Sequence, residues 1–217
     1  MKRGFGLEIP GTLEEVCAPS RCSLLIYDMQ AAIVPQIAAG AEITKGCAAL
    51  LTAARAAGVR VFFTRHVFLP SKLAGVGQVR RSMIWQHKDE PEETKPFLLP
   101  GSPGSQIVPE LAPREDEGVM DKITMSAFEG TYLDLAMRDA QLTSFVVAGI
   151  ALEVGIEPTV RHALDKNYIP VMIPELCGSK TDMAHERSLG TLRETGEVLM
   201  VGLDEVLAAW GRPPAEL

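Results

Sequence analysis

Ionisable side chains follow short apolar runs at three points of the sequence, where they could do acid–base or anion-binding chemistry. Asp28 comes directly after one such run, where burial would favour its protonated form and a nearby cation its ionised form. Arg65 and His66 follow the second run, and they supply a fork of hydrogen-bond donors and a group that titrates near neutral pH. Lys122 follows the third run. These residue types are suited to a small, anionic molecule.

Each of these residues also has a purely structural interpretation. An aspartate at such a place can cap a helix or lie in a loop, and Arg65 and His66 can be a surface charge and a loop residue with satisfied hydrogen bonds. A lysine there is a solvated charge unless a carboxylate pairs with it, because buried lysines need partners. Taken one at a time, the residues leave both interpretations open.

A fourth apolar run leads into a glycine-containing turn and then a helix. The turn includes Ala151 and Gly155, and Pro158 suits the first turn of the helix that follows. The first backbone amides of a helix point outward and bind an anion or oxyanion without any side chain. The alternative is a plain connection between a strand and a helix.

Alternation of short apolar runs with longer helical patterns predicts an α/β fold. The expected strands are residues 22–27, 59–64, 118–121, 144–148, 168–173 and 198–201, and the expected helices include residues 43–57, 131–139 and 156–167. Such alternation is typical of a parallel sheet with helices on both faces. Ligands bind outside the carboxyl ends of the strands in such a sheet, which is where the polar residues above are expected.

The segment 68–104 interrupts this alternation. It is rich in proline and glycine, carries mixed charge and shows no sustained period, so we expect an irregular insertion. Insertions of this kind are lids or binding loops, or they make oligomer contacts. Trp85 lies within it and could close over a ligand, fill a core or contact another subunit.

The composition predicts one globular domain over residues 1–217. The 217 residues are 47% hydrophobic and 23% charged, with a net charge of -7 and no dense group of lysines and arginines, so we expect no binding to nucleic acid or to an anionic membrane. No apolar stretch approaches the roughly 18 residues of a membrane span. The spacing of the cysteines fits neither a metal site nor a disulfide framework, which favours a reduced, cytoplasmic protein. They are Cys17, Cys22, Cys47 and Cys177.

Three motifs occur in an order that resembles the isochorismatase-like hydrolases. They are DMQ at residues 28–30, KITMSAFEGT at residues 122–131 and GIALEVGIEPTVRHA at residues 149–163. The resemblance spans roughly residues 23–178. It implies a Rossmann-like, three-layer α/β/α fold with strand order 3-2-1-4-5-6, a small-molecule substrate and a homo-oligomer, either dimer or tetramer. In the amidase members an Asp, a Lys and a Cys form a triad, and Asp28 and Lys122 match the first two.

The resemblance fails at the third member of that triad, because Gly155 falls where the family usually has its cysteine. Glycine cannot attack a carbonyl, so a thiol route would need another nucleophile. Cys177 is one alternative, although a free cysteine is more often an inert, buried residue. Metal-binding relatives carry Asp-x-His after their second strand, whereas this chain has only Arg65 and His66 there, so we expect no metal and no cofactor.

The resemblance therefore implies a hydrolase that works without a cysteine nucleophile. Asp28 would either protonate an enol ether or activate water against an amide or carbamoyl C–N bond, with Lys122 beside it. The residues expected to bind the substrate are Gly155, Ala151, Arg65, His66, Phe128 and Trp85. The alternative is a catalytically inactive binding or scaffold protein on the same fold.

Overall fold

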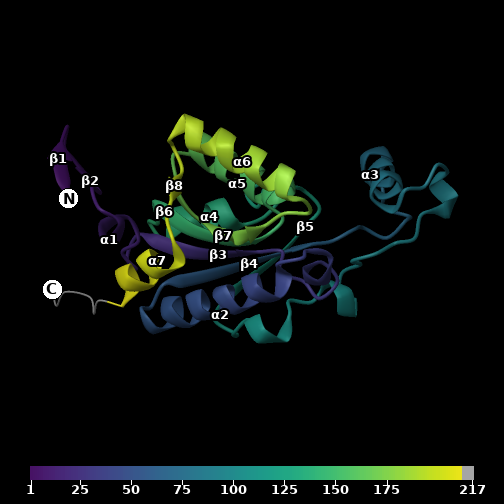
Figure 1. Cartoon of the computed structure of the whole chain (residues 1–217), viewed down its shortest axis with the longest axis horizontal. Coiled ribbons are helices and arrows are strands. Elements are labelled where there is room, and N and C mark those ends of the chain that lie inside the picture. Colours follow the sequence, from purple (N-terminus) through teal and green to yellow (C-terminus); the bar gives the residue numbers. More distant parts are fainter. Residues whose placement is uncertain (212–217) are drawn as a thin grey trace.

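A parallel sheet of six strands forms the centre of the computed structural model, which describes residues 1–211 (Figure 1). The strands are β3 (Cys22–Tyr27), β4 (Arg60–His66), β5 (Gly118–Lys122), β6 (Ser144–Ile150), β7 (Ile169–Gly178) and β8 (Leu199–Met200). They lie in the order β5-β4-β3-β6-β7-β8, and every neighbouring pair is parallel. Numbered along the sheet-forming strands, this is the order 3-2-1-4-5-6, so that prediction is confirmed.

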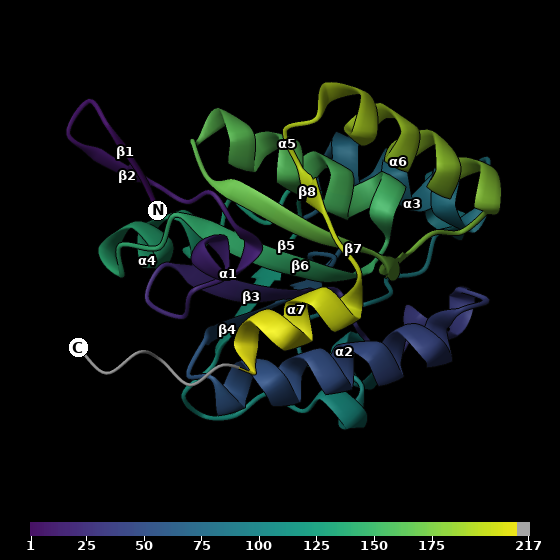
Figure 2. The same ribbon diagram turned by 60° about the vertical axis from the view of Figure 1, so that its left-hand side comes forward.

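Helices cover both faces of the sheet and complete three layers (Figure 2). On one face lie α1 (Leu13–Val16), α2 (Gly40–Ala56) and α7 (Leu203–Trp210), and on the other α4 (Leu133–Asp139), α5 (Glu157–Asp165) and α6 (Asp182–Thr195). Every residue of β3 is buried, and its side chains alternate between the two apolar clusters. This burial on both faces explains why β3 is a continuous apolar run.

Several strands extend beyond the predicted ends. β4 continues through Arg65 and His66, because these residues pair in parallel register with Asp121 and Lys122 of β5. β7 continues as far as Gly178 and so includes Cys177. Side chains alternate along a strand, so Arg65 and His66 point to opposite faces of the sheet instead of leaving it together.

The expectation that residues 68–104 hold no regular structure is wrong for α3 (Val76–Gln86). Within this helix only Ser82 is buried, so it has no core-facing apolar stripe from which its period could be recognised. The helices α6 and α7 and the hairpin of β1 (Lys2–Gly4) and β2 (Leu7–Ile9) were not predicted either. The remaining short elements are η1 (Val34–Gln36), η2 (Pro91–Glu93), η3 (Pro103–Ser105), η4 (Pro109–Leu111) and the π-helix η5 (Leu152–Ile156).

The insertion leaves the body of the protein at the carboxyl end of β4. In Figure 1, α3 lies well to the right of the sheet and is joined to it by two long segments. Arg81 of α3 donates a hydrogen bond to the Ile123 carbonyl at 3.0 Å, just after β5. The helix is thereby tied to the edge of the sheet where a ligand would bind. No helix within residues 1–211 combines the length and the apolar character needed to cross a bilayer.

Candidate active site

Asp28 and Lys122 meet in a buried ion pair at the carboxyl edge of the sheet. Asp28 follows β3 and Lys122 ends β5, and the Lys122 Nζ lies 2.7 Å from Asp28 Oδ2. Thr64, on the intervening strand β4, donates its hydroxyl to Asp28 Oδ1 at 2.7 Å. Asp28 is 5% exposed and Lys122 2% exposed. The strand order therefore brings together three side chains that are far apart in the sequence.

Side-chain donors surround the carboxyl group of Asp28. Both Asp28 oxygens accept hydrogen bonds, one from an ammonium group and one from a hydroxyl, and a carboxylate is stabilised by such donors. Burial lowers the pKa of Lys122, while Asp28 opposes this shift. Lys122 also donates to the Thr124 carbonyl at 3.2 Å, so its charge is held in place from two sides.

A cavity of about 590 Å³ opens over Asp28. Its wall combines strand ends, the turn after β6 and residues from the 68–104 insertion. Most of the wall is apolar, as is usual for sites of small molecules. The apolar residues include Ile33, Ile37, Ile84, Trp85, Phe97, Leu98, Met125 and Val154. Lys95 and Lys180 also line it, which gives the cavity two cations.

Two polar atoms on the wall of this cavity lack a hydrogen-bond partner within the described chain: His66 Nε2 and Glu153 Oε2. His66 is 4% exposed, and burial together with the positive charge of Lys122 lowers its pKa from 6.5 to about 4. The ring is therefore neutral at pH 7. Buried polar groups are normally paired, so these two atoms are unusual features of the residues that line the cavity.

The turn at Gly155 differs from the open helix N-terminus that we expected. The Gly155 amide donates to the Ala151 carbonyl at 2.9 Å within the π-helix η5, so it is already engaged. The peptide bond between Ile150 and Ala151 is cis. Both Ala151 and Gly155 nevertheless line the cavity.

Tyr27 fills the space beside Gly155. A Cβ atom added to Gly155 would overlap the phenol oxygen and ring of Tyr27. The Tyr27 hydroxyl donates to the Met125 carbonyl, and the Lys122 Nζ lies 4.3 Å from the centre of the ring. Burial, followed by the negative charge of Asp28, raises the pKa of Tyr27 well above its ordinary value, so the phenol is neutral.

Arg65 and Phe128, both expected at the site, lie elsewhere. Arg65 points to the other face of β4, where it pairs with Asp121 at 2.6 Å, and it is not among the residues that line the cavity. Phe128 stacks on Tyr168 with ring centres 5.4 Å apart, within the apolar cluster on one face of the sheet. Arg65 lies outside the cavity because side chains alternate along β4, and Phe128 does so because it packs in the core.

Cys177 also lies away from the cavity. It is buried in β7 within the same apolar cluster, and burial raises its pKa well above the ordinary value. A thiol held neutral in this way is a poor nucleophile. Of the remaining predicted residues, His66 and Trp85 line the cavity over Asp28.

The sequence interpretation missed three residues at the site: Tyr27, Thr64 and Gln30. The buried Gln30 side chain donates to the carbonyls of His66 and Ser105, both at 3.0 Å, and accepts from the His66 amide at 2.7 Å. Gln30 thus fixes the end of β4 beside Asp28. Its place in the DMQ motif was a usable signal, as was the position of Tyr27 directly before Asp28.

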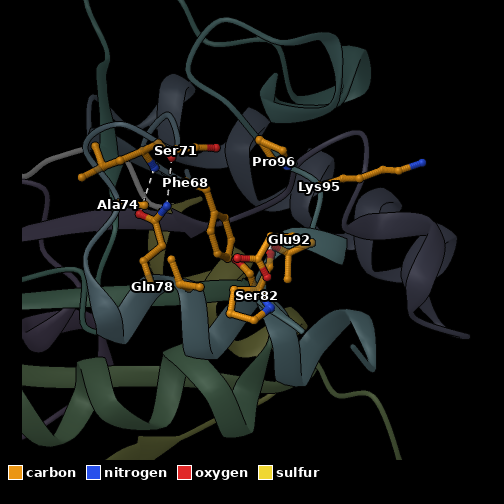
Figure 3. A pocket seen from close by; sticks show the side chains of 12 residues that line it. Phe68, Ser71, Ala74, Gln78, Ser82, Glu92, Lys95 and Pro96 are labelled. Carbon is orange, nitrogen blue, oxygen red and sulfur yellow. Dashed lines mark hydrogen bonds between the residues drawn. The ribbon is translucent and has the colours of Figure 1, made fainter. Parts of the chain in front are cut away.

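A second cavity of about 310 Å³ lies inside the insertion (Figure 3). All its lining residues fall between Phe68 and Pro96, and the Gln78 side chain there bonds to both backbone groups of Leu69, at 2.9 and 3.0 Å. No buried ion pair of residues 1–211 lines it. Nor does the described part of the chain bring together three or more His, Cys, Asp or Glu side chains in a way that could hold a metal.

Comparison with known proteins gives one matching domain family and several related proteins. The isochorismatase domain matches residues 22–201. The ureidoacrylate amidohydrolase RutB of Serratia proteamaculans is 26% identical over 185 residues, covering 78% of this chain and 75% of that protein. The N-carbamoylsarcosine amidase of an Arthrobacter species is 33% identical over 128 residues, 59% of this chain and 46% of that protein. A cysteine hydrolase of Pseudomonas syringae pv. phaseolicola shares the fold, with a TM-score of 0.76, 23% identity and coverage of 88% and 93%.

Proposed function

Since this chain belongs to the isochorismatase family, we propose that it hydrolyses a small molecule with water activated by Asp28 and without a cysteine nucleophile. The observation that carries the proposal is the buried Asp28–Lys122 pair below a cavity of about 590 Å³. A buried charged pair that opens onto a cavity is a common feature of catalytic sites.

The bonding of Asp28 favours water activation over protonation of an enol ether. Each oxygen of Asp28 accepts a hydrogen bond, as the oxygens of a carboxylate do, and the carboxylate is the form that can take a proton from water, whereas the enol-ether route needs a protonated Asp28. We therefore propose hydrolysis of an amide or carbamoyl C–N bond. The names of the Serratia and Arthrobacter relatives, an amidohydrolase and an amidase, support the same class.

In the proposed reaction the water oxygen bonds to the carbonyl carbon while one water proton passes to Asp28. The C–N bond then breaks, and Asp28 returns that proton to the departing nitrogen. Lys122 holds Asp28 in position through their ion pair. On the motif alignment, Gly155 stands where the family's cysteine would be, so no acyl-enzyme forms there.

The charge and polarity of the cavity suggest a small, anionic substrate with a polar end. Lys95 and Lys180 supply positive charge, while Glu153 and the neutral imidazole of His66 make one part of the wall polar. A ureido or amide acid has both features. The apolar wall, including Trp85, would exclude water from the remainder of the molecule.

A second candidate is a binding or scaffold protein without activity. Two observations favour it: the Gly155 amide is already bonded to Ala151, and the Tyr27 phenol fills the space next to Gly155. Both reduce the ability of this turn to bind a reacting carbonyl group and stabilise its oxygen.

The two candidates are separated by assaying the purified chain against amides, ureido acids and enol ethers, with thermal unfolding measured in parallel. We expect the chain to hydrolyse an amide or ureido acid, with release of an amine or ammonia. Turnover of enol ethers alone would contradict water activation. A compound that raises the unfolding temperature while none is turned over would establish the binding function instead.

A further inference from the structure

We propose that Tyr27 and Gly155 form an exchanged pair: position 155 has lost the cysteine side chain, and the Tyr27 phenol fills the space that this side chain would occupy. The phenol oxygen then positions the attacking water. This inference rests on the proposed function for its catalytic part. Its steric part stands on the structure and the motif alignment, and it can be tested without any substrate.

The steric part follows from the packing at Gly155. A side chain there would collide with the oxygen and two ring carbons of Tyr27, and Tyr27 is only 1% exposed. Thr159 of α5 donates its hydroxyl to the Gly155 carbonyl at 2.7 Å, which fixes the turn. Neither the Tyr27 side chain nor the turn at Gly155 can move without disturbing its neighbours, because protein interiors are close-packed.

Several contacts hold the phenol in this place. Tyr27 ends β3, and its side chain lies on the same face of the sheet as Leu25. Its hydroxyl donates to the Met125 carbonyl, and the ammonium group of Lys122 lies over its ring at 4.3 Å. Tyr27 thus contacts Lys122 of the ion pair, directly precedes Asp28 in the chain and lines the cavity.

The hydroxyl can bind water but is unsuited to replace the thiol as a nucleophile. Its proton is donated to Met125, and the phenol stays neutral because burial raises the pKa of Tyr27 well above its ordinary value. The Thr159 side chain also hydrogen-bonds to the phenol and slightly opposes the rise in its pKa, which leaves the second lone pair of the oxygen to accept from water. A water that donates one hydrogen to this oxygen has its other hydrogen free to pass to Asp28 as the water attacks.

The pair predicts that a cysteine at position 155 is tolerated only when Tyr27 is reduced in size. The test compares the thermal unfolding of Gly155→Cys, Gly155→Ala, Tyr27→Val and the double variant Tyr27→Val/Gly155→Cys. We expect both single changes at Gly155 to lower the unfolding temperature strongly, and the double variant to unfold above Gly155→Cys. Gly190→Cys is the matched control, since a Cβ there meets nothing within 4 Å.

Alkylation by iodoacetamide gives a second measurement on the same proteins. The four native cysteines are buried, so labelling of the native chain should be slow. The new thiol of the double variant, beside Lys122 and open to the cavity, should be labelled at least as fast as the exposed thiol of Gly190→Cys. Two results would overturn the exchanged pair. One is a Gly155→Cys variant that unfolds at the native temperature and is labelled as fast as the double variant. The other is a double variant that is no more stable than Gly155→Cys.

The catalytic part is tested by Tyr27→Phe, which keeps the ring and removes the oxygen. We expect kcat on the C–N substrate to fall about tenfold or more with little change in KM, because a hydrogen bond to the attacking water is lost in the transition state. An unchanged kcat would overturn the role of the oxygen. If the native chain turns over nothing, the proposed function fails, while the unfolding and labelling results still decide whether Tyr27 and Gly155 are exchanged.

Discussion

Asp28 accepts hydrogen bonds from side chains of two different strands, so its charge is balanced only in the folded protein. Lys122 supplies the positive charge and is itself 2% exposed. Removing one partner of such a pair leaves the other charge buried and uncompensated, which is far more costly than losing an exposed pair.

Lys122→Met should therefore lower the free energy of unfolding by about 3–5 kcal/mol. Urea denaturation of the native and variant chains measures this difference. Lys45→Met is the matched control, because Lys45 pairs with Glu42 on an exposed face of α2 and should change stability by about 1 kcal/mol or less. Equal effects of the two changes would show that the Asp28–Lys122 pair is not buried as described.

His66 should give the protein a distinctive dependence on pH. Its folded pKa of about 4 lies below its ordinary value of 6.5, so the unfolded chain binds the proton first as the pH falls. Stability should thus be lost between pH 6.5 and 4, at up to about 1.4 kcal/mol per pH unit from this group. Urea denaturation at several pH values should show a smaller loss for His66→Gln than for the native chain.

At the scale of residues, the sequence predicted the pair but not its surroundings. Asp28 and Lys122 could be identified because they occur within motifs of fixed order and spacing. Tyr27 and Thr64 could not, because their roles depend on which side chains the sheet brings next to them. Arg65 was placed wrongly because β4 extends two residues further than predicted, and strand alternation then turns Arg65 to the other face.

The insertion carries the element that most affects access to the site. The end of α3 contributes Ile84 and Trp85 to the cavity wall, although Trp85 is 40% exposed and much of the helix faces solvent. Strands could be predicted from their apolar runs, but α3 lacks such a pattern because its contacts are few. Since Ile84 and Trp85 line the cavity, we propose that α3 acts as a lid over the site.

Trp85 should report ligand binding through its fluorescence. It is one of two tryptophans; the other, Trp210 in α7, is buried and donates to the Cys17 carbonyl at 2.9 Å on the far side of the sheet. A compound hydrolysed by the protein should change the emission of the native chain. Trp85→Phe should abolish that change and Trp210→Phe should retain it. A full response in Trp85→Phe would place the ligand elsewhere.

At the scale of the whole molecule, the alternation of apolar runs and helical patterns predicted the parallel sheet with helices on both faces. The strand order came from the resemblance to a family, since periodicity alone cannot say which strands are neighbours. Residues 68–104 remained unpredictable because their conformation depends on contacts with the sheet edge, such as the bond from Arg81 to Ile123.

The homo-oligomer stays a prediction at this scale. Leu73 and Val76, at the start of the α3 region, are 68% and 87% exposed, so they are available for a subunit contact. Light scattering should give a mass that is a multiple of 23.5 kDa. Leu73→Glu/Val76→Glu should lower that mass if α3 makes the contact. A native mass of one chain would contradict the prediction.

The most direct test of catalysis by Asp28 is the kcat of Asp28→Asn on an amide or ureido acid that the native chain hydrolyses. Asparagine keeps the size of the side chain, tolerates the positive φ of 46° at this position and retains an amide oxygen that can accept from Lys122, so the variant loses the base and the negative charge, with some loss of stability, but keeps the geometry. Asp121→Asn, whose carboxylate pairs with Arg65 outside the cavity, serves as the control. We predict that Asp28→Asn folds and loses about 10²- to 10⁴-fold in kcat, while Asp121→Asn keeps the native kcat. A folded Asp28→Asn with a kcat within about threefold of the native value would contradict it.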